Sequence, residues 1–79
     1  MTELRIVYSA KARADLRALE DYIAEHDGQS RADMVLDRII ETIRTIAFMP
    51  GMGRPRPDIG EGGQAFSVSP WMIFYVPLP

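Results

Sequence analysis

The chain has 79 residues, of which 47% are hydrophobic and 25% are charged, the size and composition of one small globular domain over residues 1–79. It contains no cysteine, which excludes disulfides and thiolate metal sites, and with no signal-peptide pattern we expect a reducing cytoplasm. The net charge of −2 argues against strong non-specific binding to nucleic acid, and no apolar run is long enough to cross a bilayer.

Charged residues are unevenly distributed along the chain. Eight of the nine basic residues are arginine, and nine of the eleven acidic residues precede Pro50. Arginine favours bidentate, partly buried contacts with carboxylates or phosphates. An acidic first part followed by Arg54 and Arg56 therefore indicates protein partners at least as much as nucleic acid.

The first elements are predicted from the spacing of apolar residues. Alternating apolar and polar residues predict a short strand over Glu3–Ser9, and Ser9 is suited to cap a following helix. One helical stripe then predicts a helix over residues 10–26, and Gly28 supplies a left-handed C-terminal cap. The stripe is formed by Ala12, Leu16, Leu19 and Ile23.

A second helix is predicted to follow after a very short connection. Ser30 and Asp33 have the spacing of a capping box, and Pro50 ends the helix because proline lacks an N–H and clashes with the preceding turn. The short connection predicts an antiparallel helical hairpin. The apolar face of this helix is broad and contains Met34, Val35, Leu36, Ile39, Ile40, Ile43, Ile46, Ala47 and Phe48.

Residues 49–58 are predicted to form a semi-rigid loop that presents two arginines. Gly51 and Gly53 permit positive φ angles. Because each arginine precedes a proline, helical geometry is disfavoured at Arg54 and Arg56. The loop is either a contact surface with two guanidinium groups or a plain connector with two solvated arginines.

The segment after the loop is predicted to form the first strand of a hairpin. Residues 58–63 are rich in glycine and are expected to be flexible. Alternation over residues 64–69 then predicts a strand with Phe66 and Val68 pointing inward.

The last strand is predicted over residues 71–76, which are all apolar, a pattern typical of a central strand covered on both faces. The chain ends soon after it, so one strand edge is expected to be free. Trp71 and Tyr75 would share one face of this strand. Either the arginine loop covers that face and creates an arginine–aromatic surface, or both rings pack against the helices.

No motif for catalysis, cofactor binding or metal binding is present. The single histidine, His26, is interpreted as a positive charge at the C-terminal end of the first helix. Cleavage of RNA would require a general base and a general acid. The residues after Pro50 contain no histidine or lysine, and their only acids are Asp58 and Glu61. We therefore expect a protein that is not an enzyme, without a cofactor or a metal.

A set of short segments, taken in order, carries a family resemblance: Tyr8-Ser9, Asp15-Leu16, Tyr22-Ile23, residues 43–50, Gly53-Arg54-Pro55-Arg56-Pro57, Phe66-Ser67-Val68 and Ile73-Phe74-Tyr75. In this order they resemble the ParE branch of the RelE/ParE toxin superfamily. The resemblance implies an α+β fold with the order β-α-α-β-β, in which a helical hairpin packs on a small antiparallel sheet. The chain departs from the family pattern at Gln64 and Val76, where arginine is common, and in lacking the C-terminal strand of the family.

The resemblance also implies a function, the toxin component of a type II toxin–antitoxin system. ParE-like toxins inhibit DNA gyrase and are neutralised by a ParD-like antitoxin. The alternatives are a RelE-like endoribonuclease that cleaves mRNA on the ribosome, and a truncated, inactive toxin that only binds its antitoxin. We expect a hetero-oligomer with the antitoxin, or a homodimer of the isolated chain, with no membrane association and no sequence-specific nucleic-acid binding.

These considerations select two groups of candidate site residues. Target binding is expected at Arg54, Arg56, Trp71 and Tyr75. Antitoxin binding is expected at the apolar surface of the helices, which is larger than one thin sheet can cover. Its candidate residues are Leu16, Leu19, Ile23, Met34, Ile40 and Phe48.

Overall fold

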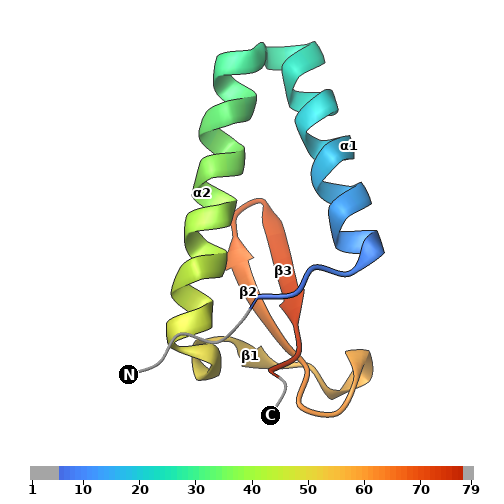
Figure 1. Cartoon of the computed structure of the whole chain (residues 1–79), viewed down its shortest axis with the longest axis vertical. Coiled ribbons are helices and arrows are strands. Elements are labelled where there is room, and N and C mark those ends of the chain that lie inside the picture. Colours follow the sequence, from blue (N-terminus) through green and yellow to red (C-terminus); the bar gives the residue numbers. More distant parts are fainter. Residues whose placement is uncertain (1–5, 78–79) are drawn as a thin grey trace.

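Two helices form an antiparallel hairpin in the computed structural model, which describes residues 6–77 (Figure 1). Helix α1 spans Ala10–Asp27, and its first turn is capped as expected, because the Ala12 N–H donates to Ser9 Oγ at 3.0 Å. Gly28 alone connects α1 to α2. Its φ of 91° favours glycine, and its N–H donates to the Ala24 carbonyl at 3.1 Å, which confirms the predicted cap.

Helix α2 spans Gln29–Phe48 and begins one residue before the predicted capping box. Ser30 therefore lies inside the first turn and makes no cap, so the capping-box prediction is wrong. Instead, the side-chain amide of Gln29 donates to Asp33 Oδ1 at 2.8 Å and to Glu20 Oε2 of α1 at 3.3 Å. The helix ends before Pro50, as the sequence predicts.

Within residues 6–77 the sheet has three antiparallel strands in the order β1-β2-β3, namely β1 (Arg54–Pro55), β2 (Gln64–Val68) and β3 (Trp71–Tyr75). Among these, β2 is the central strand, and the prediction that residues 71–76 are covered on both faces is wrong. Because the helices cover only one face of the sheet, half-buried and exposed side chains alternate along β3. Met72 and Phe74, on the uncovered face, are 47% and 53% exposed. Among residues 6–77, only β2 pairs with β3.

The predicted N-terminal strand is absent from residues 6–9, which are not in a strand. Residues 3–5 of the predicted range lie outside the described residues. The third strand comes instead from the predicted loop over residues 49–58, as β1. Two 3-10 turns flank it, η1 (Pro50–Met52) and η2 (Pro57–Ile59). Hydrogen bonds order residues 56–63, including residues 58–63, which the sequence predicted to be flexible.

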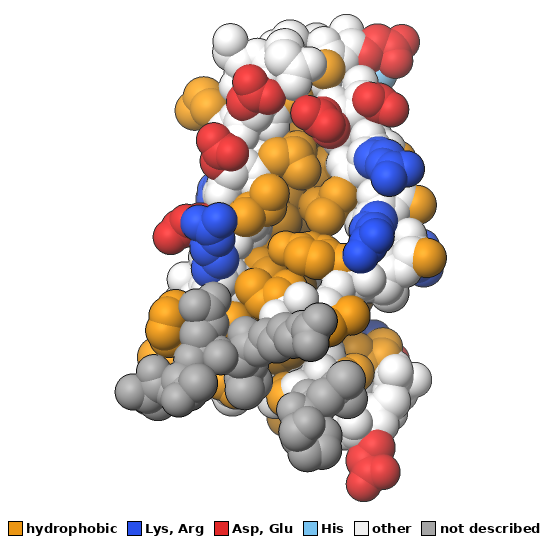
Figure 2. All heavy atoms as spheres, viewed as in Figure 1, with side chains coloured by type: hydrophobic (Ala, Val, Ile, Leu, Met, Phe, Trp, Pro, Cys, Tyr) orange, Lys and Arg blue, Asp and Glu red, His pale blue; other side chains and the backbone are white. Residues whose placement is uncertain are grey.

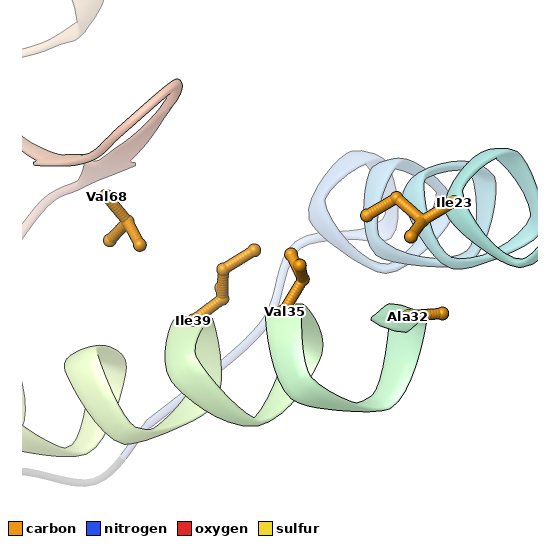
Figure 3. Packing of buried hydrophobic residues seen from close by; sticks show 5 residues of the cluster. All are labelled: Ile23, Ala32, Val35, Ile39 and Val68. Carbon is orange, nitrogen blue, oxygen red and sulfur yellow. The ribbon is translucent and has the colours of Figure 1, made fainter. Parts of the chain in front are cut away.

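The core lies where the helical hairpin meets the inner face of the sheet (Figure 3). Val68 of β2 points toward α2, and Ile23 of α1 points toward the same helix. Phe66 packs at the edge of the cluster, which confirms the predicted inward residues of β2 and the α+β fold class. The buried members are Ile23, Ala32, Val35, Ile39 and Val68.

We expect Ile39→Ala to lower the free energy of unfolding by about 2–5 kcal/mol, because it leaves a cavity between α2 and β2. Ile39 is 5% exposed, whereas Met34 on the same helix is 63% exposed. Met34→Ala is the matched control and should change stability by about 0.5 kcal/mol or less. Urea unfolding followed by circular dichroism measures both values, and equal effects of the two substitutions would contradict this description of the core.

Candidate functional site

The hydroxyl of Tyr75 fixes the start of the arginine loop, which we define as residues 53–58. The Gly53 N–H donates to Tyr75 Oη at 3.0 Å, and Tyr75 Oη lies 2.7 Å from the Pro50 carbonyl oxygen and 2.9 Å from Gln64 Oε1. A hydroxyl has a single proton, so it donates to only one of these two acceptors. If the hydroxyl donates to the Pro50 carbonyl, a half turn of the Gln64 side-chain amide puts its NH₂ group next to Tyr75 Oη, and Gln64 becomes the donor in that contact. The hydroxyl thereby joins β3, β2 and the end of α2.

Gly53 is required at this point by space and not by its backbone angle. Its φ is −78°, and the positive-φ glycines of the described residues are Gly28, Gly60 and Gly62, so neither Gly51 nor Gly53 uses the positive φ that glycine permits. A Cβ at Gly53 would collide with Tyr75 Oη and would lie 3.0 Å from the Ala65 carbonyl oxygen. The absence of a side chain lets the loop approach the sheet.

The guanidinium of Arg56 is held by two contacts within the chain. Its Nε and Nη2 donate to Asp58 Oδ1 and Oδ2, each at 2.8 Å. It also lies over the ring of Phe74, with Cζ 5.1 Å from the ring centroid. The hydrogen bonds from Arg56 lower the pKa of Asp58 below its ordinary value, and the same bonds raise the pKa of Arg56. Arg56 therefore has a fixed orientation.

The register of the sheet places the arginines on its outer face. Arg54 is opposite Ala65, which is opposite Phe74, so these three side chains share the face away from the helices. Arg54 is exposed and has no ion-pair partner within residues 6–77. Met72 and Phe74 give this face an exposed apolar part, and Arg56 lies over the Phe74 ring.

The structure does not bring the four candidate target-binding residues onto one surface. Trp71 and Tyr75 share the inner face of β3, as the sequence predicts, but the arginine side chains lie on the other face. Trp71 packs against the core, and Tyr75 reaches the loop only through its hydroxyl. The aromatic residue beside the arginines is Phe74, which the sequence reasoning missed because it took β3 to be covered on both faces.

The six candidate antitoxin-binding residues are also divided among several surfaces. Leu16 and Leu19 are half-buried against the core, and Ile23 belongs to the core at 4% exposure. Figure 2 shows hydrophobic side chains gathered between α1 and α2, with acidic side chains toward the helix connection and basic ones on both helices nearer the sheet. Ile40 and Met34 are about 120° apart around α2, so one partner element cannot cover both.

The part of the chain that the structure describes offers little for other chemistry. No group of three or more acidic or histidine side chains there is placed to hold a metal ion, and no described helix is both long and apolar enough to span a membrane. His26 lies at the C-terminal end of α1, with Nδ1 2.8 Å from the Tyr22 carbonyl oxygen and its ring stacked on that of Tyr22.

Comparison with known proteins adds two findings. Residues 6–78 match the family described as the ParE toxin of the type II toxin–antitoxin system parDE. The chain is also similar to Toxin ParE3 of Caulobacter vibrioides, with 30% identity over 71 residues that cover 90% of this chain and 71% of the relative.

We expect Gly53→Ala and Tyr75→Phe to destabilise the protein through the same contact. Tyr75→Phe removes the partner of the Gly53 N–H and the Pro50 carbonyl, and should lower the free energy of unfolding by about 1–3 kcal/mol. Gly51→Ala is the matched control, because a Cβ there meets no atom within 4 Å. Thermal unfolding measures all three, and a Gly53→Ala protein as stable as Gly51→Ala would contradict this role of the hydroxyl.

The ion pair between Arg56 and Asp58 should stabilise the protein in a pH-dependent way. The folded pKa of Asp58 lies below its ordinary value of 3.8, so the contribution is present above that value and is lost as the pH falls through the folded pKa. Wild type and Asp58→Asn should therefore differ in urea midpoint at neutral pH and converge in strong acid. A difference that stays the same at both pH values would show that the carboxylate charge is not its cause.

Proposed function

The chain belongs to the ParE family of toxins of type II toxin–antitoxin systems, and on this basis we propose that it inhibits DNA gyrase and is neutralised by a ParD-like antitoxin. A type II toxin implies an antitoxin partner. Both proposed partners place its action in the cytoplasm. The observation that best supports target binding is the arginine loop beside an exposed apolar face.

The outer sheet face has the composition of a protein contact surface. Arginine and aromatic residues contribute most of the binding energy in many interfaces, and methionine is enriched there too. Arg54 is exposed on the same sheet face as Phe74 and Met72, and Arg56 is already oriented by Asp58 and the Phe74 ring. A surface whose side chains are oriented before binding loses less conformational entropy when the partner arrives.

Inhibition by binding fits these residues better than RNA cleavage does. A ribonuclease needs a general base and a general acid beside the scissile phosphate. Near the arginines, the carboxylate of Asp58 is bound to Arg56, and the lowered pKa of Asp58 makes it a weak base. We therefore propose that the toxin acts without catalysis.

We propose that the antitoxin places an amphipathic helix in the apolar region between α1 and α2. Leu16, Leu19 and Ile40 are half-buried, so each keeps exposed surface that a partner can cover. No strand of residues 6–77 pairs with the outer edge of β3, so this edge is a second place for a partner, because an unpaired strand edge is a template for a further strand. A hetero-oligomer with the antitoxin, or a homodimer of the isolated chain, covers such an edge.

The test of the proposed target is a supercoiling assay of purified gyrase, run beside in vitro translation with the same protein. Inhibition of supercoiling with intact translation supports the proposal. Inhibition of translation with intact supercoiling favours the ribosome as target and contradicts it. No effect in either assay, from a protein that binds its antitoxin, favours an inactive toxin.

Replacing Arg54 and Arg56 together with alanine should weaken gyrase inhibition and toxicity strongly. Stability should fall by about 1 kcal/mol or less, the usual contribution of a surface ion pair. Arg56→Ala removes one such pair, with Asp58, and Arg54 has no ion-pair partner among the described residues. The matched control is Lys11→Ala with Arg44→Ala, which removes two exposed cations from the helices. A large loss of stability with toxicity intact would assign these arginines to folding instead.

Introducing a charge at Ile40 should weaken binding of the antitoxin. Ile40→Glu places a carboxylate beside the apolar region between the helices, where a partner would have to desolvate it, and we expect at least a tenfold rise in the dissociation constant. Thr45→Glu, on an exposed part of the same helix, adds the same charge and serves as the control. Calorimetric titration measures both, after circular dichroism shows both variants to be folded; unchanged binding by Ile40→Glu would remove this surface from the proposal.

A further inference from the structure

A groove runs along the flank of α2 that carries Met34, beside the turn that joins β2 to β3. One wall is formed by Arg31, Met34 and Arg38, and the opposite wall by Val68, Pro70 and Trp71. Figure 1 shows this turn beside the middle of α2. The groove is separate from the apolar region between the helices and from the arginines of the outer sheet face.

Two cations border this groove at a fixed spacing. Arg31 and Arg38 are seven residues apart on α2, so they lie two turns apart on nearly the same side of the helix, about 10 Å along its axis. Both are exposed, and neither forms an ion pair with any carboxylate of residues 6–77. This contrasts with Lys11, Arg44 and Arg56, each of which is paired.

The surface between the two arginines is apolar. Met34 lies between them on the helix and is 63% exposed, Val35 and Val68 are buried beneath, and Trp71 is half-buried. Methionine adapts its shape to an apolar partner. The groove thus offers two positive charges and one adaptable apolar contact in a row.

We propose that this groove binds an acidic segment of the antitoxin, with two carboxylates about 10 Å apart and one apolar side chain between them. Carboxylates at positions i and i+7 of a helix, with an apolar residue midway, meet this description. The inference rests on the proposed function for the identity of the partner, and charge complementarity supports it. The arginines would set orientation and association rate, while the apolar contact holds the complex together.

Two other occupants fit the charges less well. A second copy of this chain presents three acids on its own α2, namely Asp33, Asp37 and Glu41. Asp33 is bound to Gln29 and Glu41 is paired with Arg44, so Asp37 alone of the three has no partner in the described residues, whereas the groove calls for two carboxylates. A nucleic acid would bring phosphates near Glu41, one turn from Arg38, in a chain of net charge −2. The apolar floor also has no counterpart on a phosphate backbone.

The experiment reverses the two charges and measures binding to the cognate antitoxin. Arg31→Glu with Arg38→Glu is compared with Lys11→Glu with Arg44→Glu, which makes the same change in net charge at cations that are already paired. Circular dichroism shows that both variants are folded. Fluorescence anisotropy with labelled antitoxin, at low and high salt, gives the dissociation constants.

We expect the groove variant to raise the dissociation constant at least tenfold at low salt, with a smaller effect at high salt, and the control to change it less than twofold. Lysines in place of two antitoxin acids should restore binding to the groove variant. Equal binding by wild type and groove variant would overturn the inference while leaving the proposed function in place.

Other outcomes separate the remaining occupants. Failure of wild type to bind the antitoxin would overturn the proposed partner and this inference together. If the groove variant loses binding to a DNA duplex while its antitoxin binding is unchanged, the groove is assigned to nucleic acid. If the groove variant loses the self-association that wild type shows in sedimentation, again with unchanged antitoxin binding, the groove is assigned to a second copy.

Discussion

The hydrogen bonds of the Tyr75 hydroxyl connect the two halves of this domain. One half is the helical hairpin, which ends at Phe48, and the other is the sheet, which begins at Arg54. The hydroxyl contacts the Pro50 carbonyl and the Gly53 N–H, so the chain leaves the helix along a fixed path. That path brings β1 into register with β2 and places Arg54 on the outer face. The candidate target-binding surface therefore depends on an aromatic residue that faces the other side of the sheet.

The fold has two layers, so each helix and strand leaves some apolar surface uncovered. In a domain of this size the core can contain only part of the hydrophobic side chains. Here it takes one flank of α2 and the inner face of β2 and β3. Met72 and Phe74 remain on the outer sheet face, and Met34 remains on the flank of α2. Exposed apolar patches bordered by charges are typical of interaction surfaces, which agrees with membership of a toxin family that implies an antitoxin partner.

Charge pairing within the chain divides the arginines into two kinds. Arg44 and Arg56 have carboxylate partners, while five others form no ion pair with any residue that the structure describes: Arg13, Arg17, Arg31, Arg38 and Arg54. Paired cations at a surface contribute little to stability and are partly neutralised. Among the unpaired ones, Arg54 lies on the outer sheet face, and Arg31 and Arg38 lie on either side of the exposed Met34, where we propose that partners bind.

The sequence by itself determined the elements whose signals are local. Ser9, Gly28 and Pro50 predict where the helices start or stop, because capping and the loss of an N–H act within one turn. Family membership could likewise be inferred from short segments in order. The tertiary structure alone decided which faces are covered: β3 is apolar throughout, yet only its inner face meets the helices, so Phe74 and not Tyr75 joins the arginines. Strand pairing and burial depend on contacts between distant residues, which local spacing does not contain.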